Sequence, residues 1–139
     1  MLDANILIRA VLGSRVSLML RKYADHVEFL APDTAFLEAS ERLPDILEGR
    51  GLPVLPAMQA LNLIARIVQT IDTETYSKCQ TIAHERIDRR DEGDWPVLAS
   101  ALALDCPIWT EDTDFFGCGV ATRTTDRVEL YLAEASSAR

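Results

Sequence analysis

Five acidic side chains stand at or near the ends of elements that the sequence predicts, and their type suits a divalent metal ion. They are Asp3, Glu38, Asp94, Asp112 and Asp114. Mg²⁺ prefers an octahedron of oxygen ligands at about 2.1 Å, so a few carboxylates from distant parts of a chain can form its site. An ion held in this way activates water and stabilises charge on a phosphate group without a histidine base. The acids therefore predict metal-dependent hydrolysis of a phosphate ester.

Other common catalytic arrangements are missing from the sequence. The two histidines, His26 and His84, do not stand at predicted strand ends, so neither is placed as a catalytic base. The chain contains no Gly-x-Ser-x-Gly, P-loop or Gly-x-Gly-x-x-Gly motif. Its cysteines, Cys79, Cys106 and Cys118, have no Cys-x-x-Cys spacing and favour a reduced, cytoplasmic setting. The carboxylates remain as the main candidates for chemistry.

Each acid also has a structural explanation. Asp94 would cap the helix that follows it, a contribution of about 1 kcal/mol. Asp112 and Asp114 would begin a turn, where aspartate is common. Glu38 alone is typical of a solvated helix surface. Asp3 is the hardest to explain in this way, because an unpaired carboxylate inside an apolar segment costs several kcal/mol.

The elements that must position these acids alternate between strands and helices. We expect strands over residues 1–9, 27–31, 69–71, 107–110 and 120–122. We expect helices over residues 14–24, 33–48, 57–68, 73–87, 95–104 and 128–134, with a kink or restart at Pro44. This alternation predicts a single α/β domain over residues 1–135 with a mostly parallel sheet, followed by a frayed tail at 136–139. Sites in such folds form at the carboxyl ends of the strands.

Composition limits the class of protein. The chain has 139 residues, of which 48% are hydrophobic, so it can bury a core and is not expected to be disordered. Its 22 acidic and 14 basic side chains give a net charge of -8, which argues against coating nucleic acid by bulk charge. No apolar run approaches the roughly 20 residues that span a bilayer, so we expect no membrane partner.

Two segments resemble PIN-domain nucleases. They are LDANILIRAVLG at the start and the more specific RDEGDWPVLASALALDCPIWTEDTDFFG, joined by the helix with Glu38 and a later strand. The resemblance covers nearly the whole chain and implies a Rossmann-like, three-layer α/β/α fold with a central, mostly parallel sheet. It also implies an endoribonuclease that depends on Mg²⁺ or Mn²⁺. Such proteins are often the toxin of a VapBC-type toxin–antitoxin pair, with an antitoxin and a second copy of the chain as partners.

The resemblance assigns roles to particular residues. The catalytic acids that it implies are Asp3, Glu38, Asp94 and Asp112. The metal ligands that it implies are Asp3, Asp94, Asp112 and Asp114. Polar positions that orient the carboxylates match Asn5 and Thr110.

The chain departs from the family pattern at two places. Asp3 has only two residues before it, where the family usually has a longer strand, so the strand is expected to be clipped or to start upstream. Asp91 competes with Asp94 for the third acidic position. We prefer Asp94 because it directly precedes the apolar helix.

Arginines flank the predicted acidic site and are candidates for binding RNA phosphates. They are Arg9, Arg15, Arg86, Arg89 and Arg90. The last three could instead complement a helix C-terminus. Trp95 and Trp109 could stack on bases, although Trp109 suits the core better. The apolar helices between residues 33 and 68 could bury a partner helix or a second copy of the chain, or serve only the core.

Three other functions fit parts of the pattern. A PIN-like module that has lost turnover would bind RNA or protein through the same fold. A response-receiver domain also gathers acids around Mg²⁺, but it needs a lysine after a late strand, and the chain has only Lys22 and Lys78. An Asp-x-Asp phosphatase would use Asp112 and Asp114, but that motif normally stands near the start of such a fold.

Overall fold

A short parallel sheet lies at the centre of the molecule, which we describe from a computed structural model for residues 1–87 and 92–137. Its strands are β1 (Phe29–Pro32), β2 (Val68–Ile71), β3 (Ile108–Trp109) and β4 (Thr122–Arg123). β1 pairs with β2 and β3 with β4, both in parallel. Leu2 joins the two pairs: its N–H donates to the Leu30 carbonyl at 2.7 Å, and it bridges Trp109 in parallel. The order across the sheet is therefore β2, β1, Leu2, β3, β4.

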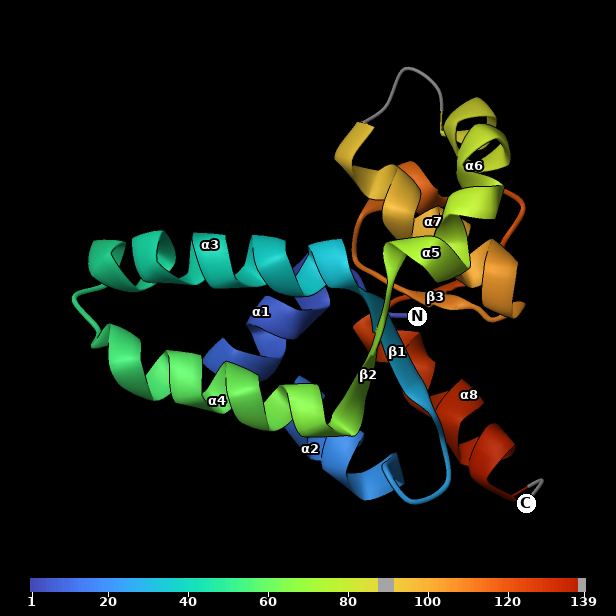
Figure 1. Cartoon of the computed structure of the whole chain (residues 1–139). Helices are drawn as coiled ribbons and strands as arrows, with labels where there is room; N and C mark the ends of the chain where they lie inside the picture. The colour runs from blue at the N-terminus through green and yellow to red at the C-terminus, as the bar shows by residue number, and fades with distance from the viewer. Residues whose placement is uncertain (88–91, 138–139) are drawn as a thin grey trace.

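Helices cover both faces of this sheet (Figure 1). One face packs against α1 (Ala4–Leu12), α2 (Arg15–Tyr23), α3 (Asp33–Gly49), α4 (Val54–Ile67) and α8 (Thr125–Ser137). The other packs against α5 (Thr73–Tyr76), α6 (Gln80–Arg86) and α7 (Trp95–Leu104). Neighbouring strand residues alternate between the two apolar cores: Trp109 belongs to the first and Ile108 to the second. The three-layer α/β/α prediction is confirmed.

The first element differs from the prediction. A strand was expected over residues 1–9, but pairing in this region is limited to the bridge at Leu2, and α1 begins at Ala4. Asp3 is the N-cap, since one of its carboxylate oxygens accepts from the Ile6 N–H at 3.0 Å. Burial of Ala4, Leu7 and Ala10, three residues apart on one face, favours the helix over an extended chain. Asp3 and Asn5 therefore do not share a strand face.

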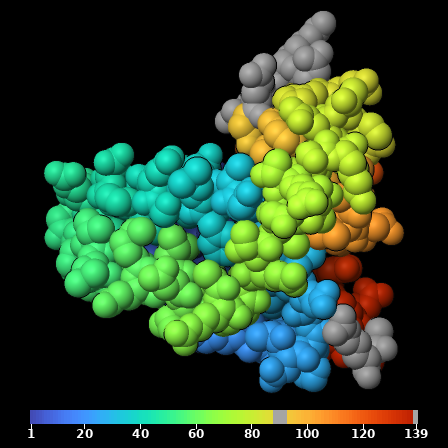
Figure 2. All heavy atoms as spheres, viewed as in Figure 1, coloured from blue at the N-terminus to red at the C-terminus, as the bar shows by residue number. Residues whose placement is uncertain are grey.

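The long helix α3 continues through Pro44, where a kink or restart was expected. Ala35, Ala39, Leu43 and Leu47 follow one another at intervals of four and are all buried. Their burial against the first core offsets the roughly 3 kcal/mol that an internal proline costs. Together α3 and α4 form an arm that projects from the rest of the molecule (Figure 2).

Other helices and strands begin or end at residues that differ from the prediction. The helix expected over residues 73–87 is broken by the 3-10 turn η1 (Ser77–Cys79), because Asp72 caps the short α5 separately from α6. β4 begins two residues later than expected and ends one residue later. α8 begins before the expected residue 128 and extends to Ser137. Within the described residues, no helix has the length and apolar character needed to cross a membrane.

Candidate metal centre

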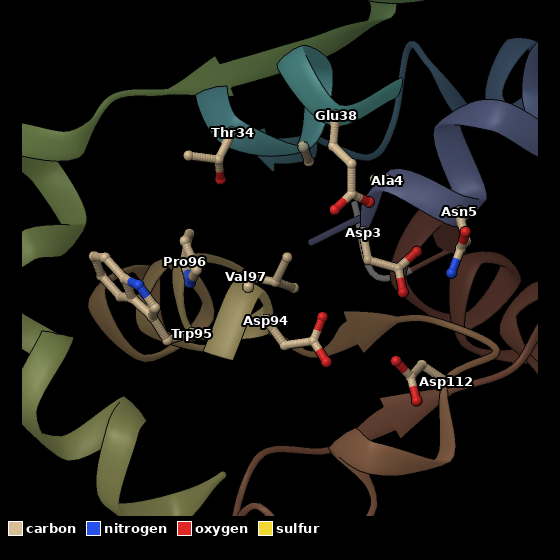
Figure 3. Close-up of a pocket in the computed structure, with 12 residues that line it drawn as sticks. Asp3, Ala4, Asn5, Thr34, Glu38, Asp94, Trp95, Pro96, Val97 and Asp112 are labelled. Atoms are coloured by element: carbon tan, nitrogen blue, oxygen red, sulfur yellow. The ribbon is translucent and has the colours of Figure 1, made fainter. Parts of the chain in front are cut away.

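Acids from four separate parts of the chain line one cavity of about 340 Å³. They are Asp3 at the start of α1, Glu38 on α3, Asp94 before α7 and Asp112 after β3. Figure 3 shows Asp3, Asp94 and Asp112 with their carboxylates directed toward a shared space, and Glu38 above Asp3. The fold therefore brings together residues that are up to 109 positions apart in the sequence, from Asp3 to Asp112.

Asp3 is the most deeply buried of these acids, with only 5% of its surface exposed. One carboxylate oxygen accepts from the Ile6 N–H, and the other accepts from the Thr110 hydroxyl. Burial is the main cause that raises the pKa of Asp3 to about 6, and the charges of Asp112 and Glu38 add to it. The two hydrogen bonds oppose this rise. Burial and the neighbouring negative charges therefore disfavour the ionised form of the Asp3 carboxyl group.

Thr110 connects Asp3 to the acids that follow β3. Its hydroxyl donates to Asp3 and accepts from the Asp112 N–H at 2.9 Å. An Asp112 carboxylate oxygen in turn accepts from the Asp114 N–H at 2.9 Å. Thr110 is fully buried, and its own N–H donates to the Arg123 carbonyl at 3.0 Å. This chain of hydrogen bonds links Asp112 to Asp3 through Thr110.

Replacing Thr110 with Val is expected to raise the pKa of Asp3 further, because the variant keeps the shape but loses the donor. The partly buried Asp112 N–H also loses its acceptor, which lowers the free energy of unfolding by about 1 kcal/mol. Carboxyl titration by NMR and urea unfolding would measure both effects. Thr110→Ser keeps the hydroxyl and is the control. An Asp3 pKa that is equal in the Val and Ser variants would contradict the assignment.

Asp94, Asp112 and Asp114 offer carboxylate oxygens that all lie within 4.8 Å of one another. Among the described residues, the Asp94 side chain makes no capping hydrogen bond to α7, although it occupies the N-cap position. Helix capping is therefore not what holds this carboxylate at the cavity. Asp91, the alternative third acid, lies outside the described residues.

The donor set fits a hard divalent cation. It consists of carboxylates alone, with Asp3 on the neighbouring wall of the cavity. Oxygen ligands of this kind suit Mg²⁺ or Mn²⁺ and do not suit softer ions that favour thiolate or imidazole. Residues that could hold an ion are Asp94, Asp112 and Asp114, with Asp3 beside them.

Glu38 and Asn5 meet through an arginine that sequence reasoning missed. The Arg42 guanidinium donates to the Asn5 side-chain oxygen at 2.8 Å and lies 3.4 Å from a Glu38 oxygen. Asn5 thus contacts the acidic site through Arg42, and this is how it could orient Glu38. The spacing of Glu38 and Arg42, four apart on one helix, is the sequence signal that could have identified the pair.

The arginines expected at the rim occupy different surroundings. Arg9 is exposed on α1. Arg15 pairs with Asp126 at 2.7 Å. Arg86 donates to the Cys118 carbonyl at 3.3 Å, and its guanidinium lies where a side chain on Gly119 would clash, at 2.7 Å from an added Cβ. Arg89 and Arg90 lie outside the described residues.

The two tryptophans differ in exposure and position. Trp95 lines the wall of the acidic cavity, and its ring packs edge-on against Tyr76 with centroids 5.6 Å apart. Trp109 is 3% exposed and belongs to the first core, as expected, with its indole N–H donating to the Thr125 hydroxyl. Trp95 is therefore the tryptophan that a bound base could reach.

Comparisons with known proteins agree with this architecture. A sequence model described as a PIN domain matches residues 1–133. The fold is similar to a chain in the crystal structure of VapBC2 from Rickettsia felis bound to a DNA fragment from their promoter, with a TM-score of 0.66. That match has 14% sequence identity and covers 89% of this chain and 96% of the other. No curated protein matches the chain significantly.

Proposed function

Since the PIN-domain match spans residues 1–133, the chain belongs to the PIN-domain family, and we propose that it is an endoribonuclease that depends on Mg²⁺ or Mn²⁺. The observation that carries this proposal is the convergence of Asp3, Glu38, Asp94 and Asp112 on one cavity. PIN domains are generally nucleases, and an all-carboxylate site needs no histidine. The family therefore supports nuclease chemistry, and the cavity supports its location.

In the proposed mechanism, Asp94, Asp112 and Asp114 hold the ion, and Asp3 completes its surroundings. A divalent ion at this place supplies positive charge against the charge that develops on the phosphate and makes water a better nucleophile near neutral pH. The Thr110 hydroxyl holds Asp3 and Asp112 next to each other, because it donates to the Asp3 carboxylate and accepts from the Asp112 N–H. We assign to Glu38, which lines the same cavity with half of its side chain exposed, the role of orienting the attacking water and accepting its proton.

We further propose that the chain is the toxin of a VapBC-type pair. The similarity to a VapBC2 chain supports this only at the level of fold. The arm formed by α3 and α4 exposes large apolar side chains, among them Leu37, Leu52, Leu55 and Leu63, with 49–68% of their surface accessible. An antitoxin helix or a second copy of the chain would cover such a surface.

Metal-dependent cleavage of RNA is the expected result when the purified protein is incubated with labelled single-stranded RNA. Internal cuts should appear with Mn²⁺ or Mg²⁺ and stop when a chelator is added, because the carboxylates alone repel the phosphate. Gel analysis of end-labelled products would measure it, with an Asp94→Asn variant prepared in parallel. Equal cleavage by both proteins would overturn the proposal, and RNA binding without cleavage would favour the module that has lost turnover.

A further inference from the structure

A row of hollows leads away from the acidic cavity between α1 and α3. The acidic cavity shares Asn5 and Asp112 with a second hollow of about 390 Å³. The second hollow shares Arg9, Leu12 and Arg50 with a third of about 490 Å³. Because each hollow has wall residues in common with the next, the three adjoin one another in a row, which we call the groove.

The helix α1 and the C-terminal half of α3 with its C-cap supply much of the wall of this groove. On α3 the residues Glu38, Arg42 and Ile46 follow one another at intervals of four along one stripe of the helix, and Arg50 comes four residues later, at the C-cap. On α1 the facing residues are Asn5, Arg9 and Leu12. The contact between Asn5 and Arg42 fixes the register between the two stripes, and Arg9 and Arg50 lie farther along in the same direction.

The charge changes sign along the groove. The acidic cavity comes first, Arg42 follows beside Glu38, and exposed Arg9 and Arg50 come next. Among the described residues, neither Arg9 nor Arg50 makes a side-chain hydrogen bond or an ion pair. Glu111 lines the second hollow too, but one of its carboxylate oxygens accepts from the Thr125 N–H at 2.6 Å. Two cationic side chains are thus available in the groove of a protein whose net charge is -8.

We propose that Arg9 and Arg50 form a phosphate subsite for a single RNA strand whose cleaved bond lies over the acidic cavity. This inference rests on the proposed function and specifies how its substrate lies. From Asp3 to Arg9 the helix rises about 9 Å, at 1.5 Å per residue, so the phosphate held there is not the one being cleaved. Guanidinium groups suit this role because they bind phosphate oxygens in pairs. Arg50 was not among the arginines expected to bind RNA.

The test measures binding of a fluorescent single-stranded oligoribonucleotide by anisotropy, with a chelator present so that no cleavage occurs. The variant is Arg9→Gln with Arg50→Gln, and the matched control is Arg21→Gln with Arg66→Gln, which removes two exposed arginines outside the groove. We expect the groove variant to bind about tenfold more weakly. Its slope of log affinity against log salt should fall by about 1.4, because two phosphate contacts are lost. The control should stay within about twofold of the natural protein.

A second measurement separates this inference from the proposed function. With metal present, the groove variant should lose kcat/KM on the long RNA through a higher KM, and cleave a dinucleotide as the natural protein does. A groove variant that binds the long RNA like the control would overturn the subsite even if cleavage is normal. Arginine-dependent binding without any cleavage would keep the subsite and overturn the nuclease. Each single variant should show a smaller effect, which covers the case of a poorly folded double variant.

Discussion

Asp3→Asn is expected to stabilise the metal-free protein near pH 7 and to abolish its RNA cleavage. The pKa of Asp3 is raised from 3.8 to about 6 in the folded chain, chiefly by burial. A carboxyl group with a raised folded-state pKa stabilises the fold fully below its unfolded pKa and loses that contribution as pH rises through its folded pKa. The unfavourable term near pH 7 is about 3 kcal/mol for a shift of about two units. Asparagine carries no charge and keeps one oxygen to cap α1 through the Ile6 N–H, so it relieves this term and loses only the acceptor for the Thr110 hydroxyl, a cost of about 1 kcal/mol.

Urea unfolding in the presence of a chelator would measure this effect. The variant should exceed the natural protein in stability near pH 7, and this advantage should be lost below about pH 3, under the unfolded pKa of 3.8, where Asp3 is mostly protonated in both states. The exposed Asp25→Asn change is the matched control and should show no such pH dependence. Cleavage of RNA by Asp3→Asn should be undetectable. A variant that is less stable than the natural protein at both pH values, or one that still cleaves, would contradict the proposed role of Asp3.

The acids of the cavity could be found in the sequence because carboxylates at the ends of predicted elements are visible without a structure. The environment of Asp3 could not be predicted from the sequence. The segment after it is apolar enough for either a buried strand or a helix, and short runs of this kind are ambiguous. The hydrogen bond to Ile6 and the burial of the helix decide between them. Burial raises the pKa of Asp3, and the hydrogen bond that opposes this rise comes from Thr110, 107 residues away, which meets Asp3 only because β3 lies beside Leu2.

The surroundings of the arginines also depend on contacts between distant parts of the chain. Arg9 and Arg15 were expected to bind RNA because they follow the first predicted strand, but Arg15 pairs with Asp126. Arg42 stands on the stripe of α3 that begins at Glu38, and Arg50 follows at the C-cap of that helix, at spacings of four that are visible in the sequence. Their relation to Arg9 depends on the packing of α1 against α3, a long-range arrangement that helical periodicity does not specify. The sequence therefore predicted the acids of the cavity better than it predicted the arginines of the groove.

The acids Asp94, Asp112 and Asp114 should determine how much Mg²⁺ stabilises the folded protein. Asp112→Asn is expected to remove most of the stabilisation that Mg²⁺ gives the natural protein. The carboxylates of Asp94, Asp112 and Asp114 lie within 4.8 Å of one another and repel, so an ion that binds only the folded chain stabilises it by mass action. That stabilisation is about 2.7 kcal/mol when Mg²⁺ is at a hundred times its dissociation constant. Asparagine keeps an oxygen to accept from the Asp114 N–H, as Asp112 does, and removes only the charge.

Melting temperature followed over a Mg²⁺ titration would measure this. The natural protein and Asp25→Asn should rise by several degrees, and Asp112→Asn should stay nearly flat. RNA cleavage by Asp112→Asn should fall by about 10²–10³-fold, which corresponds to several kcal/mol of lost transition-state stabilisation. In the natural protein the same ion is expected to contribute both to stability and to RNA cleavage. Loss of cleavage with an unchanged Mg²⁺ shift would therefore place the ion elsewhere and leave Asp112 a role in substrate positioning alone.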